Sequence, residues 1–323
     1  NITLNKQNRD QLRLVSYFFV FLSIKKRINM SKRTLKDWFI ATRPWSFPAS
    51  AMPIIVSIAY LFAQGADINW WMAVWTLIGM VLFHVTGNLW SDYFDFKKKV
   101  DDTDTFGATS ITSGQFEASE IRNFAIGMLV VSVLSGLGIL YCTGLPILWI
   151  GLAGAVCMLL YPFLKYNALG DLAILITFAF LPTIGTSYAI TGAIDWSVLY
   201  IALPVGLITD GILHANNTRD IATDKRAGIV TMAMSMGKKS AAWLYGFEMT
   251  FPCIWLGALV IGGYLPWPVL FTALTIPMSA KCAQTMIKGY DDINAIAMLD
   301  MRTAQLQMVF SLILSICLVV SKF

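Results

Sequence analysis

Charge is scarce in this chain. Only 13% of its 323 residues are Asp, Glu, Lys or Arg, whereas a soluble domain carries about 25%. Hydrophobic residues make up 57%, and the mean hydropathy is +0.64. So few charged side chains cannot cover a globular surface, which argues against an ordinary soluble domain and favours a membrane protein.

Histidine and paired cysteine are also lacking. The two histidines, His84 and His214, share no metal-ligand spacing, and the five cysteines show no paired spacing and lie in or beside apolar runs. The cysteines are Cys142, Cys157, Cys253, Cys282 and Cys317. This pattern indicates neither a zinc site nor a disulfide framework, and we interpret the cysteines as small hydrophobic residues.

Long apolar runs dominate what is present. About 20 residues cross the hydrocarbon core as a helix, and nine runs are of this size. They are residues 46–63, 70–90, 121–142, 145–163, 171–191, 197–217, 242–262, 265–286 and 303–320. The sequence therefore predicts an all-α polytopic membrane protein with nine transmembrane helices. Two of the breaks between runs, 91–120 and 218–241, are much longer than the others.

The basic residues predict the orientation. If the N-terminus is cytoplasmic, then of the 24 Lys and Arg residues only Lys322 falls on the opposite side. The positive-inside rule thus places the N-terminus and both long breaks in the cytoplasm. We expect an integral, multi-pass protein of the inner (cell) membrane. The net charge of +5 fits contact with membrane lipid, and no nucleic-acid partner is expected.

The first 29 residues differ from the rest. Their apolar stretch "YFFVFLSI" is too short to span, and no small-residue cleavage site follows it, so a signal peptide is not indicated. "MSKRTLKDWF", beginning at Met30, looks like a natural start. We expect residues 1–29 to be an upstream extension or a membrane-surface segment, to which we assign no function, and residues 30–323 to form the transmembrane domain.

Each long break carries a similar acidic motif at its start. The first motif is Asn88, Asp92 and Asp95 in "NLWSDYFD", and the second is Asn217, Asp220 and Asp224 in "NTRDIATD". The spacings are i, i+4, i+7 and i, i+3, i+7, and each places three oxygen-bearing side chains on one helical face. The repetition suggests two half-bundles that face each other.

Oxygen ligands beside basic side chains are suited to a metal with a phosphate group. Mg²⁺ is held by one or two carboxylates plus substrate phosphates, and Lys and Arg bind the remaining phosphate oxygens. A single D-x-x-x-D would be read as a solvated helix end with incidental charges. Two Asn/Asp motifs on one side of a membrane bundle favour a metal–diphosphate site.

These residues carry a resemblance to a known family. From about Arg43 to the C-terminus the chain resembles the UbiA superfamily of intramembrane prenyltransferases, whose two acidic motifs match those above. Within it, "NLWSDYFDFKKKVD", "YPFLKYNALGDL" and "NNTRDIATDKRAGIVTMAMSMG" look most like 1,4-dihydroxy-2-naphthoate polyprenyltransferases of menaquinone biosynthesis. However, "DTFGATSITSGQF" lacks the arginine-bearing "GPRR" of many relatives, which leaves one phosphate or acceptor contact unassigned.

The resemblance implies a UbiA-like helical bundle and an activity. The chain would transfer a polyprenyl group from a prenyl diphosphate to 1,4-dihydroxy-2-naphthoate, with Mg²⁺ as cofactor. Another aromatic acceptor, such as 4-hydroxybenzoate, is an alternative. A different class, an ion-coupled transporter, also shows polar residues in its spans and repeated halves.

The site residues follow from the same resemblance. Mg²⁺ would bind the six residues of the two motifs, with Asp92, Asp220 and Asp224 the catalytic, least replaceable positions. The diphosphate would contact Arg43, Lys165, Arg219, Lys225 and Arg226. The acceptor or the allylic cation would face Tyr161, Asp171 and Asp210. The active site would open towards the cytoplasm, and the sequence indicates no oligomeric state.

Alternatives remain open for several of these residues. Tyr161 is also explained as packing or as part of the interfacial aromatic belt. Asp210 and His214 stand at i, i+4, and they could be a proton-handling pair or a buried hydrogen-bonded pair. Lys165, four residues after Tyr161, could instead hold the carboxylate of the acceptor.

Overall fold

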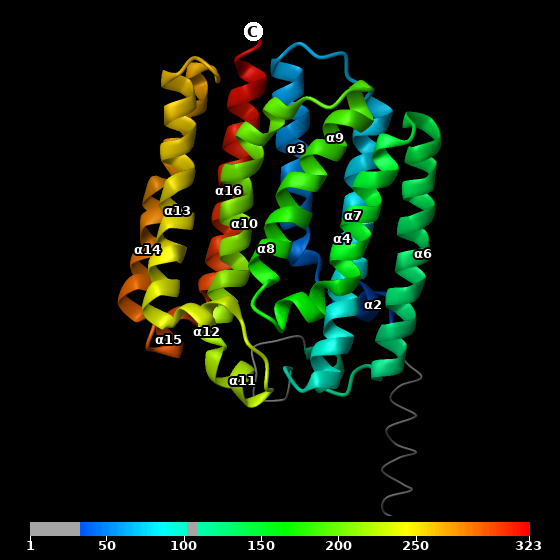
Figure 1. The fold of residues 1–323 in the computed structure, drawn as a ribbon, viewed down its shortest axis with the longest axis vertical. Helices are drawn as coiled ribbons and strands as arrows, with labels where there is room; N and C mark the ends of the chain where they lie inside the picture. Colours follow the sequence, from blue (N-terminus) through cyan, green and yellow to red (C-terminus); the bar gives the residue numbers. More distant parts are fainter. Residues whose placement is uncertain (1–32, 102–108) are drawn as a thin grey trace, which may run out of the picture.

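The computed structural model describes residues 33–101 and 109–323, so the extension expected over residues 1–29 lies outside the described residues. Over the described ranges the chain is a bundle of helices without a β-strand (Figure 1). This confirms the predicted all-α membrane fold. In lipid every backbone N–H and C=O must be paired within the protein, and a helix achieves this within one segment.

Eight helical spans of the described chain are long and apolar enough to cross a membrane. Seven of them are built on one helix each, namely α3 (Phe47–Ala63), α4 (Trp70–Lys98), α6 (Ala118–Thr143), α7 (Pro146–Lys165), α10 (Leu199–Arg219), α13 (Lys238–Ile261) and α16 (Leu299–Val320). The other is a continuous run of α8 (Gly170–Ile174), a π-helical segment η2 (Leu175–Phe180) and α9 (Leu181–Thr191).

The prediction of nine spans differs from the structure at residues 265–286. This stretch forms a 3₁₀ segment, η4 (Trp267–Thr275), followed by α14 (Ile276–Gly289). Pro277 lies in the first turn of α14, and Lys281 and Lys288 are exposed on it. The segment lies beside α13 (Figure 1), but it is neither one continuous α-helix nor uniformly apolar.

Short helices gather mostly at the end of the bundle opposite the C-terminus. They are α2 (Leu35–Ala41), η1 (Pro44–Ser46), α5 (Thr109–Thr112), α11 (Ile221–Arg226), α12 (Met232–Met236) and α15 (Ile293–Ile296). A further short element, η3 (Trp196–Val198), precedes α10. Both long breaks lie at the end with α11 and α12, as the charge distribution predicts (Figure 1).

Helix α4 is longer than the apolar run that predicts it. The Asn69 side chain caps its start by accepting from the Met72 amide at 3.1 Å, and the helix continues to Lys98. Its 29 residues span about 44 Å, whereas the hydrocarbon core is about 30 Å thick. The last turns, with Asp92 and Asp95, therefore extend towards the aqueous edge of the membrane.

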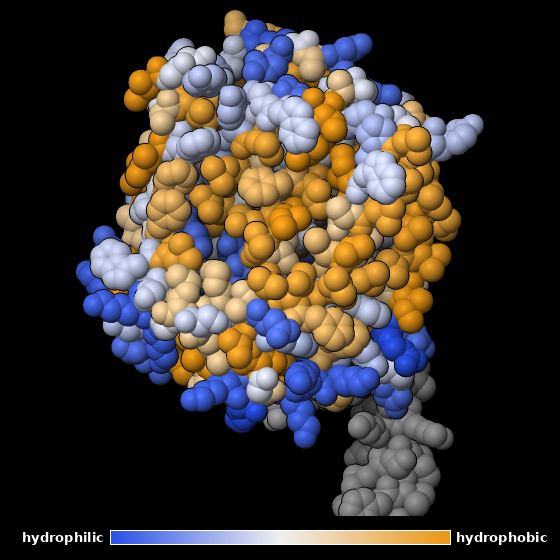
Figure 2. All heavy atoms as spheres, in the orientation of Figure 1, coloured by the Kyte–Doolittle hydropathy of each residue, from blue (hydrophilic) through white to orange (hydrophobic). Residues whose placement is uncertain are grey.

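The surface has the pattern that this placement requires. Figure 2 shows an apolar band around the middle of the molecule and hydrophilic side chains at its lower end, where the long breaks lie. Large apolar side chains of the spanning helices, such as Leu134 of α6 and Ile254 of α13, are more than 60% exposed. Such exposure is unfavourable in water and is expected against lipid tails.

Candidate active site

The two carboxylates of the first acidic motif are buried near the end of α4, and a basic side chain from the turn after α2 contacts one of them. Asp92 and Asp95 are buried. Trp38 of α2 packs edge-on against Phe116 and Phe124, with ring centroids 4.7 and 5.0 Å away. This packing fixes α2, and the turn after it brings Arg43 Nη2 within 2.5 Å of Asp92 Oδ1.

Asn88 secures the same turn from the other side. Its amide nitrogen donates to the Thr42 carbonyl at 3.1 Å and to Ser46 Oγ at 3.0 Å. Arg43 between them has φ 57°, a left-handed conformation that ordinary residues rarely adopt. The hydrogen bonds of Asn88 therefore hold a strained turn that directs Arg43 to Asp92.

Asp95 receives three donors. Ser91 Oγ lies at 3.1 Å, Lys165 Nζ at 3.0 Å and the Tyr166 hydroxyl at 2.8 Å. Lys165 ends α7 and Tyr166 follows it, so α7 supplies both long-range partners. Tyr161, one turn earlier on α7, is half-buried.

The second motif begins on α10 and continues on α11. Asn217 is buried, and its amide nitrogen lies 3.4 Å from Asp171 Oδ2 on α8. Asp220 marks the end of α10, and its carbonyl accepts from the Asp224 amide at 2.9 Å. The chain thus turns at Asp220 from one helix into the next.

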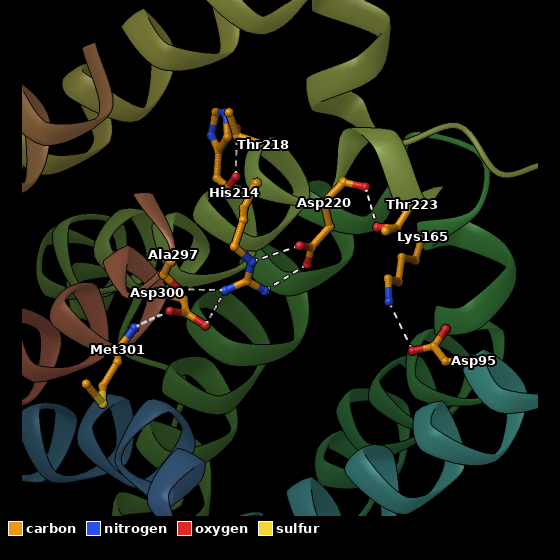
Figure 3. Close-up of polar contacts among 10 residues, drawn as sticks. Asp95, Lys165, His214, Thr218, Asp220, Thr223, Ala297, Asp300 and Met301 are labelled. Atoms are coloured by element: carbon orange, nitrogen blue, oxygen red, sulfur yellow. Dashed lines mark hydrogen bonds and ion pairs between the residues drawn. The ribbon is translucent and has the colours of Figure 1, made fainter. Parts of the chain in front are cut away.

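Figure 3 shows that Asp220 faces Arg219. The Arg219 guanidinium donates to both Asp220 carboxylate oxygens at 2.8 Å. It also donates to Asp300 Oδ2 at 3.1 Å and to the Ala297 carbonyl at 3.2 Å. Arg219, predicted as a diphosphate contact, therefore lies against the start of α16, on the side of Asp220 away from Lys165 and Asp95.

Asp224 lies towards the first motif. Its carboxylate is buried on α11, and Lys165, Asp220 and Asp95 are among its electrostatic neighbours. Burial raises its pKa to about 7, and the negative charges of Asp220 and Asp95 add to this rise while Lys165 opposes it. Lys225 and Arg226, on the same short helix, are exposed.

A backbone contact links the end of α7, which carries Lys165, to the segment that follows the second motif. The Ala168 amide donates to the Val230 carbonyl at 2.7 Å, and the Val230 amide donates to the Tyr166 carbonyl at 3.1 Å. The loop after α7 is thereby joined to the loop after α11. Lys165, which pairs with Asp95 of the first motif, and Asp224 of the second motif are consequently placed at the same end of the bundle.

The predicted pair of Asp210 and His214 has a different partner in the structure. His214 Nδ1 lies 2.9 and 3.0 Å from the two carboxylate oxygens of Glu248 on α13. Asp210 and Asp171 are buried nearby, with Asp171 and Glu248 as electrostatic neighbours of Asp210. Three carboxylates and one imidazole are thus enclosed within the bundle.

The residues of the two motifs suit a hard cation that is bound partly by protein carboxylates and partly by a substrate. In the described part of the chain, no three His, Cys, Asp or Glu side chains come close enough to hold one ion by themselves. The buried Asp92, Asp95 and Asp224 carboxylates nevertheless lie at one end of the bundle. Mg²⁺ commonly binds one or two carboxylates and completes its shell with phosphate oxygens and water, and this donor set suits that mode.

Sequence reasoning missed four residues of the site. Tyr166 binds Asp95, Asp300 binds Arg219, Glu248 binds His214, and Asp101 is an electrostatic neighbour of Asp92 and Asp224. Glu248 carried a usable signal, because a carboxylate inside an apolar span is functional by default. The other three stand among polar residues near span ends, where sequence offers no such contrast.

Comparison with known proteins agrees with this fold and these motifs. The sequence matches the UbiA prenyltransferase family over residues 50–308. It is 31% identical over 256 residues to UbiA prenyltransferase domain-containing protein 1 of Xenopus tropicalis, covering 77% of this chain and 70% of that protein.

Two solved structures share the fold. A UbiA homologue from Aeropyrum pernix K1 aligns with a TM-score of 0.61 at 14% identity, covering 85% of this chain and 98% of that one. A UbiA homologue from Archaeoglobus fulgidus, solved with GPP and Mg²⁺, aligns with a TM-score of 0.56 at 12% identity, covering 88% of this chain and 99% of that one.

The helical bundle with two acidic motifs at one end is therefore that of an intramembrane prenyltransferase. The chain belongs to the UbiA prenyltransferase family. The activity predicted from the sequence, prenyl transfer, is confirmed at this level, and the transporter alternative is not supported. The named relative is a UbiA member other than the 1,4-dihydroxy-2-naphthoate polyprenyltransferases, so that finer assignment stays a prediction.

Proposed function

We propose that the protein transfers a polyprenyl chain from its diphosphate to an aromatic acceptor with two ring hydroxyls, 1,4-dihydroxy-2-naphthoate, and so serves menaquinone biosynthesis. The observation that carries this proposal is the placement of Lys165. It pairs with Asp95 of the first motif at 3.0 Å and is an electrostatic neighbour of Asp224 of the second. Carboxylates from both motifs thus surround one base.

Magnesium is the proposed cofactor. Asp92, Asp95, Asp220 and Asp224 would hold it, together with the side-chain amides of Asn88 and Asn217. The bound ion would neutralise charge on the diphosphate as the allylic C–O bond breaks. The A. fulgidus homologue, solved with GPP and Mg²⁺, supports this assignment by family likeness.

The chain's own bases would bind the diphosphate. Arg43 and Lys165 are placed for this, since each lies against a motif carboxylate and could turn to a phosphate oxygen. Lys225 and Arg226 are exposed on α11 and could meet the diphosphate from the aqueous side. Arg219, the last residue of α10, would act differently. It would hold Asp220 in place while it is itself bound to Asp300 of α16.

The acceptor would lie deeper, towards α8 and α10. Asp171 and Asp210 are buried there, and Tyr161 lies on the neighbouring α7. The apolar walls of the bundle would keep water from the allylic cation. The basic residues concentrated at the same end support a cytoplasmic site in an inner (cell) membrane.

Direct assay tests the proposal. Purified protein with Mg²⁺ and a polyprenyl diphosphate is given 1,4-dihydroxy-2-naphthoate or 4-hydroxybenzoate, and the prenylated products are separated and weighed. We expect product from the naphthoate, with loss of its carboxylate. If only 4-hydroxybenzoate gives a product, the assignment of the naphthoate as acceptor is wrong. If product formation does not depend on Mg²⁺, the assignment of the cofactor is wrong.

A further inference from the structure

A buried polar cluster lies about one to two helical turns deeper than the second acidic motif. It comprises Asp171 on α8, Asp210 and His214 on α10, and Glu248 on α13, and none of these residues is more than 3% exposed. Asp171 is an electrostatic neighbour of both Asp210 and His214. The four ionisable side chains therefore share one enclosed region.

The contact between His214 and Glu248 orients the imidazole. Both carboxylate oxygens of Glu248 lie within 3.0 Å of His214 Nδ1, so Nδ1 carries the hydrogen that a carboxylate accepts. The other nitrogen, Nε2, then presents a lone pair. A base held by a carboxylate in this way is the arrangement that activates substrate hydroxyls in many enzymes.

Three acceptor atoms of the cluster await a donor. Across residues 33–101 and 109–323, His214 Nε2, Asp171 Oδ1 and Asp210 Oδ1 are buried without a hydrogen-bond partner. Buried polar atoms are normally paired, so this region is suited to a ligand that donates hydrogen bonds. Hydroxyl groups on an aromatic ring are such donors. Asp171 also connects the cluster to the second motif, through its 3.4 Å contact with Asn217.

Resting on the proposed function, we propose that His214, oriented by Glu248, is the general base that takes a hydroxyl proton from the aromatic acceptor. As the O–H bond breaks, its electron pair forms a ring carbonyl, and the adjacent ring carbon forms a bond to the prenyl C1. The prenyl C1–O bond breaks, and the diphosphate leaves with that electron pair. The proton resides on His214 Nε2.

The second half of the reaction returns the proton. With a carboxylated acceptor, the C–CO₂⁻ bond breaks, CO₂ leaves, and the electron pair restores the aromatic ring. The ring oxygen then takes the proton back from His214. With an acceptor that carries hydrogen at this carbon, that hydrogen passes as H⁺ to the released diphosphate instead, and the C–H electron pair restores the ring.

Three carboxylates lie around His214. Glu248 contacts it from α13, Asp171 lies beside it from α8, and Asp210 stands one turn before it on α10. Tyr245 packs against the ring with centroids 6.0 Å apart, and its hydroxyl is paired with Thr303 of α16 at 2.6 Å.

The test compares His214→Gln and Glu248→Gln with the unchanged protein over acceptors of similar size whose hydroxyl groups differ in acidity. General-base catalysis contributes about 10²–10⁴-fold. For His214→Gln we expect a loss of about 100-fold or more with weakly acidic hydroxyls, and less than about 10-fold with hydroxyls already ionised at the assay pH. Glu248→Gln should show the same trend with a smaller loss.

Tyr245→Phe is the matched control, because it removes a buried hydroxyl, paired with Thr303, from the ring that packs on the same imidazole. Its effect should be uniform across the acceptors, and prenyl diphosphate binding should be unchanged in all three variants. A uniform loss in His214→Gln would overturn the proposal, as would a uniform loss in Glu248→Gln if the first variant does not fold. Failure of the unchanged protein to prenylate any acceptor would instead refute the proposed function.

Discussion

Arg43 Nη2 lies 2.5 Å from Asp92 Oδ1, and this contact joins the turn after α2 to the last turns of α4. Lys165 and Asp95 repeat the relationship at 3.0 Å. Each base neutralises a carboxylate that we assign to Mg²⁺. A metal–diphosphate complex would give each group a new partner of opposite charge. The base would meet phosphate oxygens in place of the carboxylate, and the carboxylate would meet a cation in place of the base.

Replacing the motif carboxylates should therefore abolish turnover. We expect Asp92→Ala and Asp220→Ala each to lower product formation at least about 100-fold, because even changes next to metal ligands cost 10–100-fold. The measurement is product formed at saturating Mg²⁺. Asp300→Ala is the control, since Asp300 also binds Arg219 but lies on α16; it should stay within a few-fold of the unchanged protein. Near-native activity in both motif variants would refute the metal assignment.

Magnesium binding should depend on the protonation of Asp224. Burial raises its pKa from the ordinary 3.8 to about 7, and a metal ligand must be deprotonated. We expect Mg²⁺ affinity to weaken as the pH falls below about 7, with proton release on binding at pH 6. Calorimetry in buffers of different ionisation enthalpy measures both quantities.

The same raised pKa fixes the sign of a stability effect. Without metal, the folded state binds a proton at Asp224 more tightly than the unfolded chain does. This group therefore lowers the free energy of unfolding as pH rises from 3.8 to about 7, and its contribution is constant above that range. Asp224→Asn should remove the pH dependence of Mg²⁺ affinity near 7; its persistence would assign that dependence to another group.

A variant of Lys165 tests which of the two substrates this side chain binds. Its contact with Asp95 places it beside the first motif, and Tyr161 lies one turn earlier on α7. If Lys165 holds the carboxylate of the acceptor, Lys165→Ala should raise the KM for the naphthoate more than the KM for the prenyl diphosphate. The opposite ratio would assign Lys165 to the diphosphate.

Orientation can be measured with a thiol reagent that does not cross membranes. In a Cys142→Ser background, Ala193→Cys and Ser240→Cys introduce exposed thiols at opposite ends of the bundle. We expect labelling of intact cells at residue 193 only, because residue 240 lies at the end rich in Lys and Arg. Labelling of residue 240 alone would reverse the orientation.

The spans and the two motifs could be predicted because their signals are local. Apolar length gave the helices, and Asn/Asp spacing gave the faces that carry the ligands. The break in η4 and α14 was missed because residues 265–286 are apolar on average, although Pro277 and Lys281 interrupt the run.

The pairing of side chains could not be predicted, because it depends on which helices are neighbours. Asp210 was the nearest acidic residue to His214 in sequence, yet α13 brings Glu248 to the imidazole. Arg219 was grouped with the diphosphate contacts because it stands beside Asp220. The packing of α16 against α10 gives it Asp300 as a second carboxylate.

The hydrogen bonds of Val230 with Tyr166 and Ala168 have a mechanical consequence. They join two loops at the same end of the bundle, so the segment carrying Asp224 cannot move away from α7 without breaking backbone hydrogen bonds. Arg43 is held by local hydrogen bonds with Ile40 and Ser46 and by the side chain of Asn88, on a turn whose left-handed backbone would gain from relaxing. One side of the site is thus fixed by backbone hydrogen bonds between distant segments, whereas the side with Arg43 can change conformation. We expect the turn that carries Arg43 to move when a diphosphate binds.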